Sequence, residues 1–256
     1  MVRIILNGYL GAMGRDIITL CDKQADAVEI VAGIDILKTK TSAPFPAYTN
    51  IFYCDMPADV ILDVSTAEAV PNVLDYAART KTNVIICTTG LDDLCVEKIK
   101  KTAETVAVFK SANMSLGINL INNLLKQAAA LLYEEGFDIE IIEKHHNRKI
   151  DAPSGTAHLL ADTVNSALNN KLKYVYERNS MREKRSIDHL GIHSLRGGTI
   201  TGEHSVIFAG HNEVIELTHT AYSREIFAVG ALKAARFLAG KPAGLYSMDD
   251  VTKNFN

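Results

Sequence analysis

The chain has 256 residues, of which 47% are hydrophobic and 22% are charged. This composition is typical of a globular protein of one or two domains and excludes a largely disordered chain. Its 27 Lys and Arg residues against 30 Asp and Glu residues give a formal net charge of −3, so no basic excess favours nucleic acid or a membrane surface as a partner.

Three further features of the sequence argue against a membrane protein, a disulfide-bonded protein and a metalloprotein. No apolar run approaches the roughly 18 residues of a spanning helix, and Met1 leads directly into an apolar strand pattern rather than a signal peptide. The four cysteines form no CxxC pair, which favours free thiols. His189 and His193 have the spacing of a helical ligand pair, but Gly191 interrupts them and no Glu follows His189. We therefore expect a cytoplasmic protein without a metal site.

The first half of the chain alternates apolar strand patterns with helical ones. Residues 2–6 form a β-branched run that stops at Gly8, and a helical pattern begins near Arg15. Further strands are expected at 28–34, 60–64, 83–87 and 106–109, and helices at 69–80 and 94–104. Near-continuous apolar strands between helices predict an α/β fold with a parallel sheet covered on both faces.

The pattern changes after Asn113. A helix of about five turns is expected over 116–132, followed by strands at 137–141 and 214–219 that alternate apolar with polar residues. Such alternation favours an antiparallel sheet with one wet face, and we expect its outer face to carry apolar side chains at Val206, Phe208, Val214 and Ile215. A final helix at 226–238 is expected to return to the first domain.

These patterns predict two domains. Residues 1–115 and 219–256 would form a Rossmann-type dinucleotide-binding domain, and residues 116–218 a second, α+β domain for substrate binding and oligomerisation.

Gly8, Gly11 and Gly14 lie between the first strand and its helix with the spacing GxxGxxG. Glycines there let the backbone approach a pyrophosphate at the helix N-terminus. Asp35 ends the second strand, where a carboxylate can accept hydrogen bonds from ribose hydroxyls. The alternatives are a turn that merely permits tight packing and an ordinary turn aspartate. Small polar loops at 87–90 and 111–114 follow two other strands and could line the same edge of the sheet, or be routine turns.

The segment 143–157 carries the strongest chemical signal. Residues 145–149 contain His145, His146 and two of the segment's three cations, and residues 153–156 read Pro-Ser-Gly-Thr at the start of a helix with unpaired N–H groups. A solvated basic loop is the alternative, but it would not need a helix opening with glycine and threonine. We predict an anion-binding site in which His145 acts as an acid or base. A glycine-rich loop at 196–204 has no assigned role.

At these motifs the sequence resembles the dihydrodipicolinate reductase family over nearly the whole chain, most specifically at 143–149 and 151–157. The resemblance implies NADH- or NADPH-dependent reduction of a cyclic dicarboxylate to tetrahydrodipicolinate in lysine and diaminopimelate biosynthesis. It implies that His145 is the general acid/base, that Lys149 donates a proton, and that His146, Gly155 and Thr156 hold the carboxylates. The cofactor-binding residues are expected to be Gly8, Tyr9, Leu10, Gly11, Ala12, Met13, Asp35, Cys87, Thr88, Thr89, Gly90, Ser111, Ala112, Asn113 and Met114.

Two positions depart from the family pattern. Ala12 stands where the family usually has Arg or Lys, and Ile36 follows Asp35 where many members have Arg. Both changes weaken the expected hold on the 2′-phosphate of NADPH, although Lys38 or Lys40 could substitute. We expect NADH to serve at least as well as NADPH.

The resemblance also implies a homotetramer built through the second domain. The short polar breaks at 113–115 and 218–220 are expected to be hinges between the domains. Two other functions stay open at this point. One is another NAD(P)-dependent dehydrogenase acting on a small dicarboxylate or an amino-acid semialdehyde, and the other is a non-catalytic dinucleotide sensor.

Overall fold

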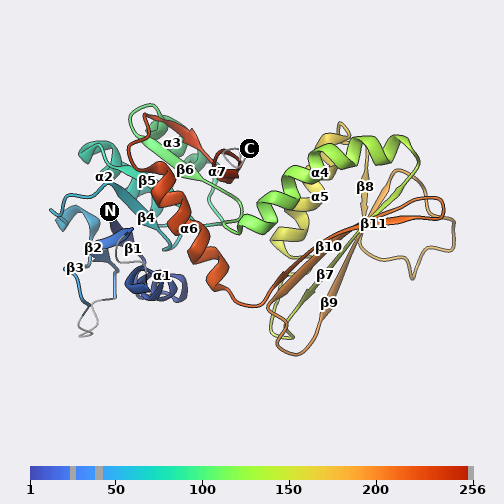
Figure 1. The fold of residues 1–256 in the computed structure, drawn as a ribbon, viewed down its shortest axis with the longest axis horizontal. Coiled ribbons are helices and arrows are strands. Elements are labelled where there is room, and N and C mark those ends of the chain that lie inside the picture. The colour runs from blue at the N-terminus through green and yellow to red at the C-terminus, as the bar shows by residue number, and fades with distance from the viewer. Residues whose placement is uncertain (24–26, 38–42, 253–256) are drawn as a thin grey trace. The chain divides into compact units, whose positions relative to one another are not determined.

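The computed structural model describes residues 1–23, 27–37 and 43–252 and divides into two compact units (Figure 1). The first comprises Met1–Leu116 and Glu225–Asn256, and the second Gly117–Arg224. The sequence analysis placed the second division at 218–219, which lies inside a strand that continues to Ala221. Within the described ranges, no helix combines the length and the apolar character needed to cross a membrane.

The first unit is built on a seven-stranded sheet in which every strand pair is parallel. Its order is β12-β6-β5-β4-β1-β2-β3. The strands are β1 (Val2–Asn7), β2 (Val28–Ile34), β3 (Ala47–Tyr48), β4 (Val60–Asp63), β5 (Asn83–Ile86), β6 (Ala107–Lys110) and β12 (Gly244–Tyr246). Apolar runs form β1, β2 and β4–β6 because both faces of the sheet are buried there, as the sequence predicts, whereas the short edge strands β3 and β12 were not predicted.

Two helical layers cover this sheet. One contains α1 (Ala12–Lys23), α6 (Glu225–Leu238) and α7 (Met248–Thr252), which share a core with Ile4, Leu62 and Phe109. The other contains α2 (Val70–Thr80) and α3 (Asp93–Ala103), with the short 3-10 helix Ile51–Tyr53. Figure 1 shows α6, near the C-terminus, running beside α1 from the other end of the chain. The predicted Rossmann-type architecture is confirmed.

The second unit is a five-stranded sheet of order β11-β10-β7-β9-β8. Its strands are β7 (Asp138–His145), β8 (Lys173–Val175), β9 (His189–Arg196), β10 (Gly202–Ala209) and β11 (Val214–Ala221). The prediction of an antiparallel sheet is confirmed for β10, which pairs antiparallel with β7 and β11, but it is wrong for β9, which pairs in parallel with both β7 and β8. The chain passes from β7 to β9 through the helix α5 (Gly155–Ala167), and a parallel pair needs such a crossover.

Helices α4 (Leu116–Glu134) and α5 pack on one face of this sheet (Figure 1). Val206 and Phe208 are fully buried in that core, so the expectation that they lie on the outer face is wrong. They alternate with Glu203 and Ile207, which point the other way along β10. Val214 and Ile215 are exposed at 63% and 38%, on the edge strand β11.

The expected hinge at 218–220 is not a break between elements. These residues lie within β11 and pair in register with Glu203–Ser205 of β10. Asn113 and Ser115 do lie in a connection, between β6 and α4.

Candidate active site

The glycine loop of the first unit depends on two positions without a side chain. Gly8 has a φ of +86°, and a Cβ there would lie 2.8 Å from the carbonyl oxygen of Val64. A Cβ at Gly14 would lie 2.7 Å from the Cα of Tyr9. A side chain at either position would collide with neighbouring backbone. Glycine at both positions lets the loop pack closely on the segment after β4 and lets α1 begin directly after the loop.

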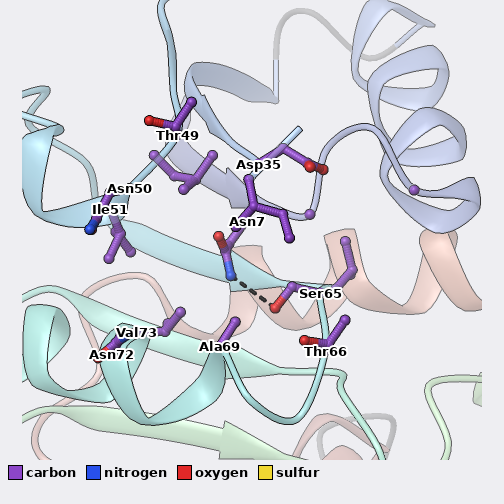
Figure 2. Close-up of a pocket in the computed structure, with 15 residues that line it drawn as sticks. Asn7, Asp35, Thr49, Asn50, Ile51, Ser65, Thr66, Ala69, Asn72 and Val73 are labelled. Carbon is purple, nitrogen blue, oxygen red and sulfur yellow. Dashed lines mark hydrogen bonds between the residues drawn. The ribbon is translucent and has the colours of Figure 1, made fainter. Parts of the chain in front are cut away.

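Asp35 is tied to this loop. Its Oδ2 accepts a hydrogen bond from the backbone N–H of Leu10 at 3.2 Å, and its Oδ1 accepts one from Leu37 at 3.0 Å. Asp35 also borders a cavity of about 300 Å³, shown in Figure 2. The rest of the cavity is lined by Asn7, Gly8, Gly11, Ile34, Ile36, Thr49, Asn50, Ile51, Val64, Ser65, Thr66, Ala69, Asn72 and Val73.

This cavity suits the adenosine half of a dinucleotide. It combines a carboxylate that can accept from ribose hydroxyls with a glycine loop at a helix start that can hold a pyrophosphate. The sequence predicted Gly8, Gly11 and Asp35 as neighbours from spacing alone, and the structure brings them together. Lys38 and Lys40 lie outside the described residues.

The other predicted loops follow β5 and β6 at the same carboxyl edge of the sheet. Thr88 is buried, whereas Thr89, Gly90 and Ala112 are exposed. Ser111 donates to the carbonyl oxygen of Asn113 at 2.9 Å. The side chains of Tyr9 and Met114 are 5% and 4% exposed and pack in the core, so these two residues can meet a ligand only through their backbone.

The second unit carries a charged cluster around His145. His145 ends β7, and Glu143, two residues earlier on the same face, is completely buried. Arg196 of β9 donates to both oxygens of Glu143, at 2.8 Å to Oε2 and 2.7 Å to Oε1. His145 Nδ1 lies 2.5 Å from Oε2 of the same carboxylate. Parallel pairing sets this geometry, because His145 stands opposite Arg196 in the register of β7 and β9.

The contacts within the cluster determine the protonation states of Glu143 and His145. Burial raises the pKa of Glu143, but hydrogen bonds from Arg196, Ser194 and His145 outweigh burial and lower this pKa to about 2. Burial lowers the pKa of His145, and the Glu143 carboxylate opposes this effect only in part. His145 is therefore neutral near pH 7, donates its Nδ1 proton to Glu143 and keeps Nε2 for other chemistry.

Ser154 and His204 complete the surroundings of His145. Ser154 caps α5 by accepting from the N–H of Ala157 at 3.1 Å, and its hydroxyl lies 2.9 Å from His204 Nε2. Burial and the neighbouring His145 lower the pKa of His204 to about 4, so His204 is neutral near pH 7. The two imidazole rings meet edge to face, with centroids 5.1 Å apart.

The backbone of β10 limits the space on one side of His145 Nε2. Gly202 faces it from β10, and a Cβ there would lie 3.1 Å from that nitrogen.

The remaining predicted substrate residues lie along the loop and helix that follow β7. Lys149 Nζ forms an ion pair with Asp151 Oδ2 at 2.8 Å. Gly155 opens α5, and a Cβ at this residue would meet nothing within 4 Å, so the helix start is accessible there. Within the part of the chain that the structure describes, His146 Nδ1 is buried without a hydrogen-bond partner.

Several residues of this cluster were not predicted as site residues. Glu143, Ser154, Arg196 and His204 carry the hydrogen bonds that orient His145, and the loop at 196–204, which had no assigned role, supplies two of them. One signal was present: Glu143 interrupts the apolar face that Ile139 and Ile141 form on β7. An acidic residue at a buried strand position requires a partner.

Known proteins resemble this chain over its full length. The family description "Dihydrodipicolinate reductase, N-terminus" matches residues 2–114, and "Dihydrodipicolinate reductase, C-terminus" matches residues 117–252. The 4-hydroxy-tetrahydrodipicolinate reductase of Clostridium tetani is 51% identical over 97% of this chain and 96% of its own length. That of Clostridium novyi is 50% identical over the whole of both chains.

Solved structures agree on the fold. A dipicolinate-bound dihydrodipicolinate reductase from Paenisporosarcina sp. TG-14 superposes with a TM-score of 0.80 at 24% identity, covering 96% of this chain and 97% of that one. Aspartate dehydrogenase from Thermotoga maritima reaches a TM-score of 0.53 at 12% identity, covering 94% and 98%, and shares only the architecture.

The relatives from Clostridium tetani, Clostridium novyi and Caldanaerobacter subterraneus are 49–51% identical over nearly their entire length, so the activity predicted from the sequence, NAD(P)H-dependent reduction in lysine and diaminopimelate biosynthesis, is confirmed. The chain belongs to the dihydrodipicolinate reductase family.

Proposed function

We propose that the second unit binds the cyclic dicarboxylate substrate of this reductase and that the first unit binds NADH or NADPH. The observation that carries this proposal is the His145 cluster, in which a buried Glu143–Arg196 ion pair holds a neutral imidazole beside the start of α5. The Paenisporosarcina enzyme is bound to dipicolinate, a planar dicarboxylate. A dianion needs cations and N–H donors to offset its desolvation, and this cluster offers both.

Each residue in this cluster has a distinct role. The N-terminus of α5 at Gly155 and Thr156 receives one carboxylate, and His146 contacts the substrate's charge. Lys149, whose ammonium group is paired with Asp151, carries the proton that the reduced ring takes up. His145 holds its Nδ1 proton on Glu143 and exchanges a proton at Nε2.

The chemistry requires these proton carriers. The nicotinamide cofactor supplies a hydride to a carbon of the conjugated imine, which leaves an electron pair on the substrate. An acid held next to the ring must neutralise that pair. Lys149 and His145 are the proposed acid–base groups, because both lie in the segment that leads from β7 into α5.

The proposed cofactor contacts are the loop residues Gly8–Met13, with Asp35 on the adenosine ribose and the loops Cys87–Gly90 and Ser111–Met114 nearer the nicotinamide. The support is their shared position at the carboxyl edge of one parallel sheet.

Absorbance at the NADH band, with and without substrate generated in the cuvette, tests this function. Substrate-dependent oxidation of NADH is expected. Oxidation driven instead by an amino-acid semialdehyde would favour the other dehydrogenase class, and NADH binding without any turnover would favour a sensor.

We also propose a homotetramer in the cytoplasm. The edge strand β11 exposes Val214 and Ile215 and has β10 as its one neighbouring strand among the described residues, so a symmetric partner can cover it. The four cysteines are free thiols, as a reducing compartment requires.

A further inference from the structure

A buried carboxyl group lies where three strands of the first unit end. Asp63 is the last residue of β4 and has no exposed surface. It stands opposite Asn7, the last residue of β1, and opposite Ile86, the last residue of β5. The proton chemistry proposed above makes no use of Asp63.

Three neutral side chains direct their hydrogens at Asp63. Asn7 Nδ2 donates to its Oδ1 at 2.6 Å, Ser65 Oγ donates to Oδ1 at 2.5 Å, and Thr88 Oγ1 donates to Oδ2 at 2.5 Å. Asn7 also donates to Ser65 Oγ at 3.0 Å, the dashed line in Figure 2. One carboxyl group therefore joins the segments that follow β1, β4 and β5.

Burying this carboxyl group costs folding free energy. Burial raises the pKa of Asp63, and the hydrogen bonds from Ser65, Thr88 and Asn7 oppose that rise only in part. A cation lies nearby, because Lys110 at the end of β6 donates to the Thr88 carbonyl oxygen at 2.8 Å, but the carboxyl oxygens themselves are held by neutral donors. An apolar side chain at this position would avoid the desolvation cost, so the stability of the fold does not explain why a carboxyl group is present here.

The tethered segments are those that line the cofactor cavity. Asn7, Gly8, Val64, Ser65 and Thr66 all border it. Gly8 packs so closely on the segment after β4 that its Cβ would lie 2.9 Å from Ser65 Cα. Thr88 opens the second proposed cofactor loop, in which Thr89 and Gly90 are exposed.

We propose that Asp63 is a positioning residue for the nicotinamide cofactor, which it never has to touch. It orients Asn7, Ser65 and Thr88 so that the glycine loop and the loop after β5 keep one fixed spacing. The proposal rests on the cofactor contacts assigned above to these two loops. Fixed spacing matters because a dinucleotide must contact both loops at once, and each loop that has to be ordered on binding weakens affinity.

The first test is the substitution Asp63→Asn. The amide keeps the shape but offers one acceptor oxygen, and its NH₂ group opposes a donor. The dissociation constant for NADH, measured by fluorescence titration of the purified protein without substrate, should rise about tenfold or more, because an unpaired buried donor costs that much. The KM for NADH should rise in parallel, while kcat at saturating NADH stays within about fivefold of wild type.

Asn83→Ala is the matched control. Asn83 is the first residue of β5, so it lies at the end of that strand opposite to Thr88. Its side chain forms hydrogen bonds with the backbone of Ala107, Leu238 and Lys241. This variant should lose thermal stability, yet bind NADH within about twofold of wild type, because it breaks buried hydrogen bonds far from the cavity.

Two substitutions at Thr88 keep the proposal testable if Asp63→Asn does not fold. Thr88→Val removes the hydroxyl that reaches Asp63 and should weaken NADH binding about tenfold, whereas Thr88→Ser should restore it. Wild-type affinity in Thr88→Val, or weakened affinity in Asn83→Ala that tracks its loss of stability, would overturn the positioning role. Wild-type protein that binds neither NADH nor NADPH would instead overturn the cofactor site, and Asp63's role with it.

Discussion

At the scale of single residues, the site depends on charges that are buried in pairs. Glu143 is fully buried, and it is stable as a carboxylate because Arg196 bonds both of its oxygens. Removing Arg196 would leave the Glu143 carboxylate buried without its cation, which is strongly destabilising, whereas Arg196 itself is partly exposed. Lys149 differs, since its partner Asp151 is 60% exposed and adds little to stability.

Lys149→Ala should therefore separate catalysis from folding. We expect kcat to fall by roughly two to four decades, the range for a positioned proton donor, with the melting temperature nearly unchanged. Steady-state kinetics and thermal denaturation check this. His146→Ala is the comparison, because a residue that contacts substrate charge should mainly raise KM. Near-normal kcat in Lys149→Ala would contradict the assignment.

Cofactor choice is also decided by individual side chains. Asp35 borders the cavity, and a carboxylate there repels the 2′-phosphate of NADPH, while Ala12 and Ile36 bring no charge to offset it. NADH should be used at least as well as NADPH. The measurement is kcat/KM for both cofactors, and a preference for NADPH of more than about tenfold, some 1.4 kcal/mol, would contradict the prediction.

At the scale of elements, the start of α5 is linked to β10 through a neutral histidine. Ser154 caps the helix and is hydrogen-bonded to His204 of β10. A protonated His204 would place a buried charge at this contact, and it would face the imidazole of His145. The junction between helix and sheet should therefore weaken in acid.

The pH dependence of stability tests this junction. Burial, followed by the neighbouring His145, lowers the pKa of His204 to about 4 in the folded protein, while the unfolded chain titrates near its usual value. Above about pH 6.5 this site is unprotonated in both states. As pH falls toward 4, the unfolded chain takes up a proton that the folded protein does not, so the free energy of unfolding falls by up to about 3 kcal/mol. His204→Gln should show a shallower fall in unfolding free energy across that window, measured by urea denaturation.

His211→Gln is the control for that measurement, because His211 is exposed in the turn between β10 and β11. Its slope should match the wild type. A His204→Gln variant with an unchanged slope would show that His204 does not control the acid response.

At the scale of the whole molecule, assembly follows from an edge that the chain does not cover. β11 is the outer strand of the second sheet, and Val214 is 63% exposed on it. Exposed edges promote association, and closed symmetric oligomers are the common way to cover them. We expect light scattering to return about four times the chain mass at working concentration. Val214→Lys should shift the distribution toward smaller species, and a wild-type monomer would refute the proposed assembly.

Local sequence patterns were enough to predict most strands and helices of the first unit and the position of the conspicuous loops, but not the strands β3, β8, β9 and β12 or the helix α7. Apolar runs predicted β1, β2 and β4–β6 because both faces of a parallel sheet are buried, which is a local property of each segment. The glycine spacing and the charged run after His145 are local as well. Family resemblance then supplied roles for His145 and Lys149.

Only the tertiary structure decided which distant residues meet. Arg196 reaches Glu143 across 53 positions, His204 reaches Ser154 across 50, and Asp63 meets Asn7 across 56. Strand pairing sets each of these contacts, and periodicity carries no information about which strand becomes a neighbour or in which direction it runs. The parallel pairing of β7 with β9, which alternation alone misassigned, places Arg196 opposite His145. Since the buried carboxylates are stable only with these partners, the chemistry of the site comes from the register of its sheets.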